Sequence, residues 1–527
     1  MTYKNKIREN IKSGQFICTL EYVPEIAAKT DGMGIDFLMN EARKLRGEFR
    51  VSGVNIGDRV KSMESLDTVQ CGKMAAEASG KMPLLHLAGK DRDANEGRAV
   101  FQRAFDLGLD TFLVISGDRV SKEMRSHRTR YFDSVNAIIA AKEMNPDCFL
   151  AAAIAPYKYK EEELINQYLK MVKKIHAGAD YLITNCGWDM EKLQELIWYR
   201  NARGFNTPIV ANLLVPAMGW ARGIHSRRLP GVYMSDDLFE KIESEHAGSK
   251  EEAKEARLQR LTLQIVGAKL MGYAGVQLSG IERTKDLLDV MSKADRLEES
   301  LGTLDAWWRA WHEIHTFEDG REVKFGPDNG LYLFGDKEPL SNSLDGPPII
   351  ERVVAAPEEK KKFARLDAID RMFFHKNTLG GTLLNFFLQA VNALPGGNIV
   401  IRKFEHTVKE SVLGCEMCGF CRIPYLFYVC PETCPKGLAN GPCAGTDENM
   451  CEFKDRECIH NKKYRIAKDL GRLSELETVF VPPVSDTREM SSWLNQFDET
   501  IPKVTVYEES TNASQSKPRQ DFEEPVQ

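Results

Sequence analysis

Eight short apolar runs, separated by longer amphipathic segments, constrain the fold of residues 1–296 more than any other feature of this chain. The runs span residues 16–23, 50–56, 83–88, 111–116, 148–154, 181–185, 208–214 and 274–279. Each is short and rich in β-branched residues, which is typical of parallel strands buried on both faces. Helical patterns such as 96–108 and 162–178 lie between them, and Gly108 and Gly178 stand where those helices should end.

Eight strand–helix pairs within about 290 residues match the number of strands and the size of a (β/α)8 barrel. A doubly wound open sheet is the alternative, but no Gly-x-Gly-x-x-Gly motif follows any of the runs. We therefore predict an α/β fold: a TIM barrel over residues 1–300, followed by a small cysteine-rich, metal-binding α+β domain.

The remainder of the chain divides by composition. Residues 301–356 are predicted to be a linker rich in Gly, Pro, Asn and Asp. It begins with a Trp-rich helix, whose Trp307, Trp308 and Trp311 we expect to pack on a neighbouring surface rather than to form a ligand platform. Residues 357–500 form the predicted cysteine-rich domain, and the polar residues 501–527 are predicted to be a disordered tail.

Charge and hydropathy exclude several classes of partner. The chain has 71 Lys and Arg against 77 Asp and Glu, so no basic field is available for nucleic acid. The longest nearly apolar stretch, residues 148–157, is far shorter than the roughly 20 residues of a membrane helix. The first residues lack the apolar core of a secretory signal. We expect a cytoplasmic protein without membrane contact, and a homo-oligomer.

Eight of the 12 cysteines fall within one short segment. In a cytoplasmic protein such a cluster indicates metal binding rather than disulfides. The ligands we predict are Cys415, Cys418, Cys421, Cys430, Cys434, Cys443, Cys451 and Cys458.

The spacing of these cysteines bears on the metal. Three thiols at Cys-x2-Cys-x2-Cys spacing with the later Cys434-Pro435 resemble ferredoxin-type [4Fe–4S] ligation, which would leave Cys430 in a second site. Cys430 and Cys434 are interchangeable in this assignment, and zinc is compatible with the same thiols. His460 is a further candidate ligand, although a solvated histidine is the preferred interpretation.

Polar residues stand at the predicted carboxyl ends of the barrel strands, where barrel enzymes place their chemistry. Carboxylates, one imidazole and amides converging there would suit acid–base chemistry on a polar heterocycle. Any one of them alone would be weak evidence, and for Glu21, His86 and the Gly117-Asp118 pair a structural role is about equally supported. The set comprises Glu21, Asn55, His86, Asp118, Asn185, Gln277 and Ser279.

Four segments carry a resemblance to methylenetetrahydrofolate reductases, which extends over about residues 10–296. FICTLEYVPE resembles the first strand of that family, LLHLAGKD its third strand and LVISGD its Arg-Gly-Asp segment, while KKIHAGADYLITNCGWD is the closest match. The resemblance implies that Glu21 is the catalytic acid and that Asp118 lies near the flavin and contacts the pterin.

Further roles are implied by matching positions along residues 10–296. The resemblance assigns cofactor binding to Asn55, His86, Gly117, Asp118 and Lys174, the last of these at the flavin phosphate. It assigns substrate binding to Asn185, Trp220 and Arg283, and we expect the same role of Gln277 from its place at the end of the last strand.

Departures from the family pattern alter several flavin contacts. Ser116 replaces an arginine, Asn55 stands where threonine is usual, and Ala155 replaces a tyrosine. FAD is the expected cofactor, with FMN as the alternative. Electrons would come from NAD(P)H or from a protein donor.

The cysteine-rich segment resembles the C-terminal domain of some bacterial reductases of this type, which occurs elsewhere as a separate partner subunit. The leading hypothesis is a flavin-dependent reductase that interconverts 5,10-methylene- and 5-methyl-tetrahydrofolate, with [4Fe–4S] clusters or zinc in the C-terminal domain and a redox partner protein. The alternatives are a flavin-free, folate-dependent methyl-transfer or demethylation enzyme, and a non-catalytic iron–sulfur or zinc adaptor.

Overall fold

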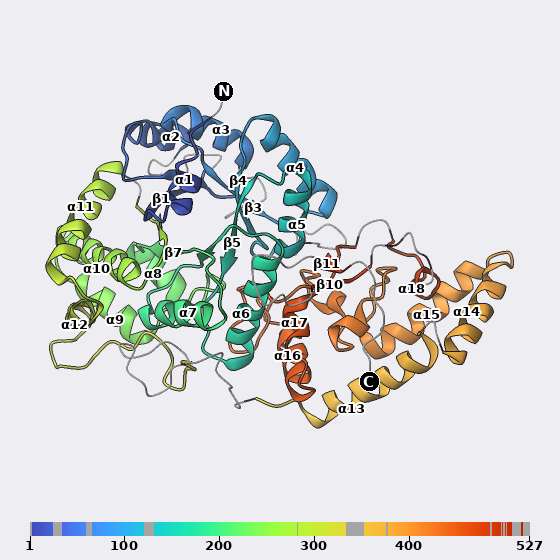
Figure 1. Cartoon of the computed structure of the whole chain (residues 1–527). Helices are drawn as coiled ribbons and strands as arrows, with labels where there is room; N and C mark the ends of the chain where they lie inside the picture. The colour runs from blue at the N-terminus through green and yellow to red at the C-terminus, as the bar shows by residue number, and fades with distance from the viewer. Residues whose placement is uncertain are drawn as a thin grey trace.

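A closed barrel of eight parallel strands forms the N-terminal half of the computed structural model (Figure 1). The structure describes residues 3–24, 34–58, 66–120, 131–281, 283–333, 353–375, 378–484, 487–496, 498, 501, 503–507 and 518–519. The strands are β1 (Ile17–Tyr22), β2 (Gly53–Ile56), β3 (Leu84–Ala88), β4 (Thr111–Ile115), β5 (Phe149–Ile154), β6 (Tyr181–Thr184), β7 (Ile209–Leu214) and β8 (Gly275–Ser279). The predicted TIM barrel is thus confirmed.

Helices surround the barrel and bury the apolar outer faces of its strands. They are α2 (Ile35–Lys44), α3 (Thr68–Ser79), α4 (Ala94–Asp106), α5 (Ser134–Met144), α6 (Glu161–His176), α7 (Met190–Ala202), α8 (Met218–His225), α9 (Asp236–Glu245), α10 (Lys250–Leu270) and α11 (Thr284–Leu301). Helix α1 (Lys6–Lys12) instead packs Ile7 and Ile11 against inward-facing strand residues such as Ile17 and Leu84. Capping follows ordinary rules: Asp93 and Glu96 form a capping box that begins α4.

The Trp-rich helix α12 (Leu304–Ile314) packs against α10 and α11 as part of the outer layer. Trp307 is fully buried, and its indole N–H donates to the Leu263 carbonyl at 2.7 Å. Gly267 makes room for this ring, because a Cβ there would lie 2.3 Å from it. The first part of the predicted linker is therefore packed on the barrel.

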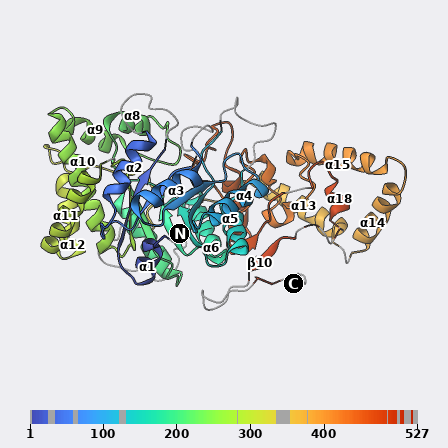
Figure 2. The ribbon, with the colours of Figure 1, turned by 90° about the horizontal axis from the view of Figure 1, so that it is seen from above.

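The C-terminal region is mainly helical and extends from one side of the barrel in both ribbon views (Figures 1 and 2). It contains α13 (Pro357–Phe373), α14 (Leu379–Asn392), α15 (Gly397–Leu413), η2 (Ile423–Leu426), η3 (Pro431–Thr433), α16 (Ile459–Asp469), α17 (Glu475–Thr478) and α18 (Ser492–Asn495). A small antiparallel sheet joins β9 (Val479–Phe480), β10 (Thr505–Tyr507) and β11 (Pro518–Arg519). Its last two strands fall within residues 501–527, so those short pieces of the predicted disordered tail are ordered; most of that tail lies outside the described residues.

The C-terminal region docks on α6, where α16 and α17 pack (Figure 1). Polar side chains along the whole of α6 make this contact. Glu161 accepts from the Tyr464 hydroxyl at 2.7 Å, and Lys173 Nζ donates to the Val479 carbonyl at 2.6 Å. Between them, Asn166 and Gln167 donate to the carbonyls of His460 and Cys443. The contact fixes the cysteine-rich segment relative to the barrel.

Among the described residues, no helix combines the length and apolar character that crossing a membrane requires.

Candidate active site and cysteine cavities

Glu21, near the carboxyl end of β1, lies at the centre of a polar cluster inside the barrel mouth. The hydroxyl of Ser279, the last residue of β8, lies within hydrogen-bond distance of both Glu21 Oε2 and Asn212 Oδ1, the latter at 2.9 Å, and donates its single proton to one of them at a time. His86 on β3 places Nδ1 3.7 Å from Glu21 Oε1. The closed barrel brings these side chains together from strands far apart in sequence. Their places at the carboxyl ends of the strands predict this convergence.

His86 is buried, and burial lowers its pKa despite the opposing influence of Glu21 and Asp58. The imidazole is therefore neutral near pH 7 and can both donate and accept a hydrogen bond. Its Nε2 is a buried atom without a hydrogen-bond partner within the described structure. Such an atom carries a desolvation cost that a bound polar ligand would relieve.

At the same end of the barrel, two side-chain amides have hydrogen-bond partners for their NH2 groups but not for their oxygens. Asn55 donates to Gln277 Oε1 at 2.6 Å and to Thr19, and Asn185 donates to the Gly231 carbonyl at 2.6 Å. The Oδ1 atoms of both asparagines are buried without a partner in the described part of the chain. With His86 Nε2, they leave three polar atoms at strands β2, β3 and β6 for a ligand rich in hydrogen-bonding groups.

The loop after β4 carries Gly117 and Asp118 and requires its glycine. Gly117 has φ +79°, which is a left-handed conformation, and a Cβ there would lie 2.7 Å from Lys90 Cβ. Tyr131 fixes the following residues, because its hydroxyl donates to the Asp118 carbonyl at 2.7 Å and accepts from Val120 N at 3.0 Å. The backbone position of Asp118 is thus closely specified.

Two residues of the cysteine-rich segment hold this same loop. Lys436 Nζ donates to the Gly117 carbonyl at 2.7 Å, and the Arg119 backbone N–H donates to Glu452 Oε1 at 2.6 Å. Lys436 and Glu452 also form a buried ion pair with each other. The mouth of the barrel is therefore built partly from the C-terminal region.

This contact reaches Asp118 electrostatically. Burial raises the pKa of the Asp118 carboxyl, and the Glu452 carboxylate raises it further, while Lys436 and Lys90 act in the opposite direction. A carboxyl with a raised pKa in a cleft is suited to hold or exchange a proton. The chemistry of Asp118 thus depends on residues outside the barrel.

The remaining predicted barrel residues are placed differently. Lys174 Nζ donates to the Ala153 carbonyl between α6 and β5, and burial, followed by Lys170, lowers its pKa to about 7. Trp220 on α8 is 47% exposed, and Arg283 is exposed at the start of α11. No contact of Lys174, Trp220 or Arg283 with the Glu21 cluster is seen among the described residues, so their predicted roles stay predictions.

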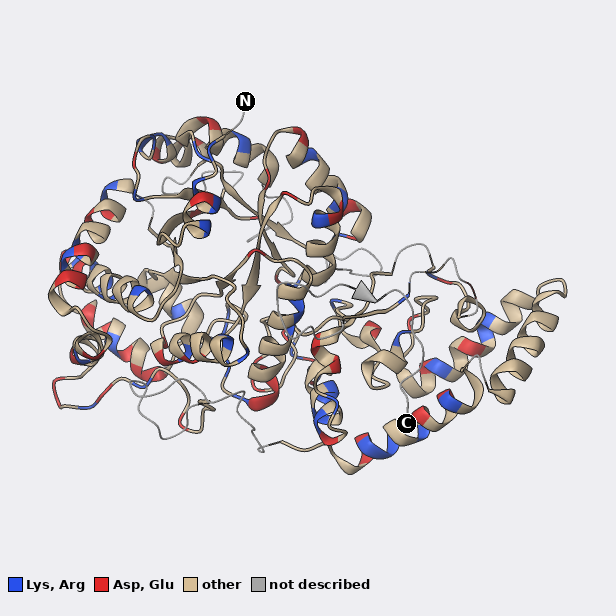
Figure 3. Cartoon of the chain, viewed as in Figure 1, with Lys and Arg blue, Asp and Glu red and all other residues tan. Residues whose placement is uncertain are grey.

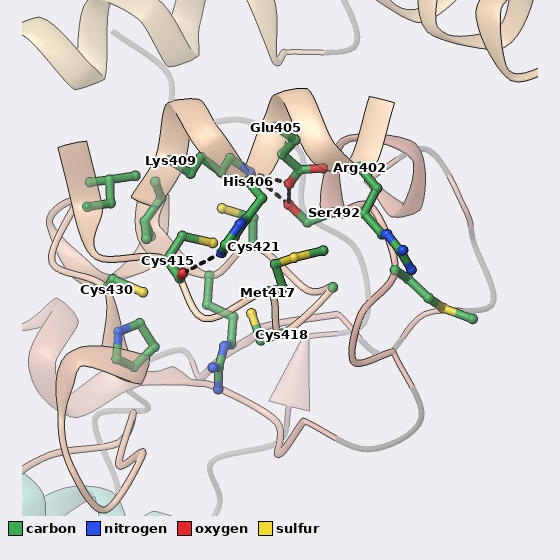
Figure 4. A pocket seen from close by; sticks show the side chains of 16 residues that line it. Arg402, Glu405, His406, Lys409, Cys415, Met417, Cys418, Cys421, Cys430 and Ser492 are labelled. Atoms are coloured by element: carbon green, nitrogen blue, oxygen red, sulfur yellow. Dashed lines mark hydrogen bonds and ion pairs between the residues drawn. The ribbon is translucent and has the colours of Figure 1, made fainter. Parts of the chain in front are cut away.

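Four thiols line a first cavity beneath α15, as Figure 4 shows. They belong to Cys415, Cys418, Cys421 and Cys430. Burial raises the pKa of Cys415 to about 11 and that of Cys430 to about 12, so both thiols are neutral near pH 7. On α15, Lys409 pairs with Glu405 at 2.8 Å and His406 bonds the Cys415 carbonyl.

The other four thiols, of Cys434, Cys443, Cys451 and Cys458, line a second cavity together with Lys436, Glu452 and His460. The preferred sequence assignment placed Cys434 with the first three cysteines and Cys430 with the second set; the structure exchanges the two. The short helix η3 separates Cys430 from Cys434 and delivers them to different cavities. Spacing alone could not decide this, because both residues follow the Cys-x2-Cys-x2-Cys loop.

The donor set of each cavity, four thiols, fits a tetrahedral zinc ion or a [4Fe–4S] cluster. Within the described residues, however, no group of three or more His, Cys, Asp or Glu side chains is assembled so as to hold a metal ion as it stands. His460 is 1% exposed, which corrects the expectation of a solvated histidine. Burial lowers its pKa far below the usual range, and three nearby lysines contribute.

Sequence reasoning missed Lys436, Glu452 and Tyr131. Lys436 follows Cys434-Pro435 and Glu452 follows Cys451, so proximity to predicted metal ligands was the only available signal. Nothing in the local sequence of any of the three indicates a contact with the β4 loop.

Comparison with known families decides the classification. Residues 6–292 match the family model described as methylenetetrahydrofolate reductase, which covers more than half of the chain. The chain belongs to the methylenetetrahydrofolate reductase family. It is accordingly an oxidoreductase acting on methylene- or methyl-tetrahydrofolate. Residues 394–486 match a second model, described as methylene-tetrahydrofolate reductase C terminal.

No curated protein matches the chain. Among solved structures, an uncharacterized protein from Clostridium thermocellum, described as binding two copies of 5-methyl-5,6,7,8-tetrahydrofolic acid, is 13% identical with a TM-score of 0.41. The match covers 55% of this chain and 99% of that one. A phosphoenolpyruvate phosphomutase from Streptomyces platensis subsp. rosaceus is 11% identical with a TM-score of 0.31, covering 57% and 88% of the two chains.

Proposed function

We propose that this family member is a flavin-dependent reductase interconverting 5,10-methylene- and 5-methyl-tetrahydrofolate, and that its C-terminal region completes the active site and carries electrons to it. The observation that carries the proposal is the contact of Lys436 and Glu452 with the β4 loop. These two residues line the second cysteine cavity and hold the loop of Asp118.

Glu21 is the proposed general acid. It lies at the end of a barrel strand, in contact with Ser279 and beside a neutral His86, so it can deliver a proton to a pterin nitrogen and open the imidazolidine ring. The Ser279 hydroxyl orients the carboxyl, and His86 limits the charge around it.

Asn55, His86 and Asn185 are the proposed polar contacts to flavin and folate, because each leaves a buried atom unpaired. Asp118 would orient the pterin and influence the charge near the flavin, and Gly117 admits the cofactor close to the backbone. Bound flavin supplies the hydride chemistry that protein side chains lack. FAD is the proposed form, with FMN the alternative set by the altered contacts at Ser116 and Ala155.

The two cysteine sets are the proposed metal ligands. Cys415, Cys418, Cys421 and Cys430 would hold one group, and Cys434, Cys443, Cys451 and Cys458 the other. Iron–sulfur clusters would supply one-electron transfer, whereas zinc would supply only structural stability. We propose clusters, because the second cavity adjoins the barrel mouth and would otherwise have no redox role there.

The first test is Glu21→Gln in anaerobically purified enzyme. Flavin should stay bound and reducible, while its reoxidation by methylenetetrahydrofolate falls 10²–10⁴-fold, the usual cost of losing a positioned acid. Glu251→Gln, an exposed carboxyl in the first turn of α10, is the matched control. Near-normal turnover in Glu21→Gln would remove this residue from the mechanism, and protein without flavin absorbance would favour the flavin-free alternative.

The second test is elemental analysis with Cys418→Ser and Cys451→Ser, one from each cavity. Each variant should lose about four iron atoms, and the loss from one cavity should leave the other loaded. Cys71→Ala, a buried cysteine outside both cavities, should change neither. Iron-free protein that contains only zinc would overturn the electron-transfer role.

A further inference from the structure

Helices α14 and α15 form a protruding hairpin whose outer side is apolar and exposed. Leu379, Leu383, Phe386 and Phe387 recur at helical spacing on α14, as do Val400, Phe404, Val408 and Val412 on α15. Leu379 is 86% exposed and Phe386 74%. We call this surface the hairpin face; it also includes Leu394 and Ile399.

The hairpin face is too large to be an ordinary feature of a monomer. Its ten exposed side chains present on the order of 1,000 Å² of apolar surface, whereas the largest patch on a typical monomer is about 300–600 Å². A stable dimer needs about 800 Å² per partner. The area available therefore matches that of a permanent interface, and exceeds what a transient redox encounter buries.

Charge narrows the choice of partner. α14 contains no Asp, Glu, Lys or Arg, as its colouring in Figure 3 shows. A partner that buried a charge against this helix would leave that charge unpaired, which is costly. Helices that lie on lipid surfaces carry Lys and Arg along their polar side, and α14 has none. The part of the partner that meets α14 must therefore be apolar and uncharged, whereas the part beside α15 can meet the exposed Lys403 and Glu410.

The chain itself offers one such face. Elsewhere in the part of the chain that the structure describes, most exposed large apolar side chains come singly, as with Phe49 and Met74. The exception is Ile369, Met372 and Phe373 at the end of α13, a helix that contacts α14 and so adjoins the hairpin face. The complement to the hairpin face is thus a second copy of it.

We propose that the hairpin face is the interface of a two-fold symmetric homodimer. Identical patches pair isologously about a two-fold axis, and two α14–α15 hairpins would then form a four-helix bundle with the apolar stripes inside. α15 turns Arg402, His406 and Lys409 toward the first cysteine cavity, away from Val400, Phe404 and Val408. Pairing therefore leaves the side of α15 that lines the cavity uncovered.

The experiment is light scattering after size-exclusion chromatography of the full chain, purified anaerobically with its cofactors. The wild type should elute at twice its 59.6 kDa mass. Leu383→Glu/Phe386→Glu should be monomeric, with its dissociation constant raised at least 100-fold and its far-ultraviolet spectrum unchanged. Phe49→Glu, which alters an equally exposed ring on the barrel side, should remain dimeric.

A photo-crosslinking amino acid at position 386 identifies the occupant. Crosslinks between two chains, each within residues 379–412, are expected. A monomeric wild type at micromolar concentration would overturn the proposal, as would crosslinks within one chain. A dimer that persists in the double glutamate variant, or a monomer that sediments with phosphatidylcholine vesicles, would overturn it as well.

Discussion

Two helical surfaces of this protein reverse the usual relation between polarity and exposure. α6 presents Glu161, Glu162, Glu163, Lys170 and Lys173 at positions that are buried under the C-terminal region. α14 and α15 present Phe386, Phe387 and Phe404 to solvent. A polar surface is thus covered within the chain, while an apolar one is left open.

The difference reflects how each surface finds its partner. The polar groups of α6 are matched one by one: carboxylates accept from Tyr464, Lys468 and Asn449, and lysines donate to backbone carbonyls. Such matching fixes orientation, because every mismatch would leave a buried polar group unpaired. The hairpin face has no polar groups matched in this way, so its binding to a partner depends on apolar area and shape. The orientation of the C-terminal region on α6 matters because its residues Lys436 and Glu452 determine where Asp118 lies.

The largest expected effect comes from breaking the polar docking at its most buried ion pair. Lys436→Met leaves the Glu452 carboxylate buried without its cationic partner, which typically costs about 3–5 kcal/mol, and it frees the Gly117 carbonyl. We expect urea denaturation to show this loss, and the pH dependence of folate-driven flavin reoxidation to shift because the environment of Asp118 changes.

A double variant distinguishes positioning from general damage. Lys436→Met/Glu452→Leu removes both charges and should regain much of the lost stability, yet the pH profile should stay altered because the β4 loop still lacks its contacts with the C-terminal region. Lys462→Met, at a half-exposed lysine of α16, is the control. A double variant with the wild-type pH profile would show that Lys436 and Glu452 have a structural role only.

The barrel could be predicted from the sequence because its pattern is local. Each strand begins and ends within three residues of its predicted bounds, since buried parallel strands read as continuous apolar runs. The Glu21, His86 and Ser279 cluster followed from strand-end positions alone, because a closed barrel brings all strand ends to one face.

The docking could not be predicted in the same way. The polar residues of α6 have the same pattern as a solvated helix face, and nothing in residues 161–176 states which segment covers them. The contacts of Lys436 with Gly117 and of Glu452 with Arg119 join positions more than 300 residues apart in sequence. Such contacts depend on how the surface of the barrel fits that of the C-terminal region, and the local sequence of either partner does not indicate that fit.

A smaller effect tests the buried lysines of α6 through pH. The pKa of Lys174 is lowered to about 7 in the folded protein, against an ordinary value of 10.5. The unfolded state then binds more protons between these values, so stability rises with pH. We expect the free energy of unfolding to increase by up to about 2 kcal/mol from pH 7 to pH 9 relative to Lys174→Met. Parallel pH curves for the two proteins would contradict the lowered pKa.

A single polar contact of the docking surface should have a more modest effect. Tyr464→Phe removes the buried hydroxyl that donates to Glu161 at 2.7 Å, while Lys468 continues to pair with that carboxylate. Loss of one hydrogen bond to a charged group should cost about 1.5 kcal/mol, measured by urea denaturation. Tyr3→Phe, a tyrosine at the N-terminus of the barrel, provides the comparison. A cost no greater than that of Tyr3→Phe would show that the α6 contact tolerates mismatches.

The smallest effect is expected on the hairpin face, where two adjacent residues of α14 separate exposure from burial. Phe387 is 61% exposed and Leu388 is 2% exposed. In the Leu383→Glu/Phe386→Glu background, where dimerisation no longer contributes, Phe387→Ala should change the free energy of unfolding by no more than about 0.5 kcal/mol. Leu388→Ala in the same background should cost about 2–5 kcal/mol, because it leaves a cavity.

In the otherwise wild-type chain, Phe387→Ala should instead weaken dimerisation, because there the ring is buried against the second copy. Equal costs of Phe387→Ala in both backgrounds would mean that this ring meets no partner, and the contrast between the two helical surfaces would then be one of composition alone.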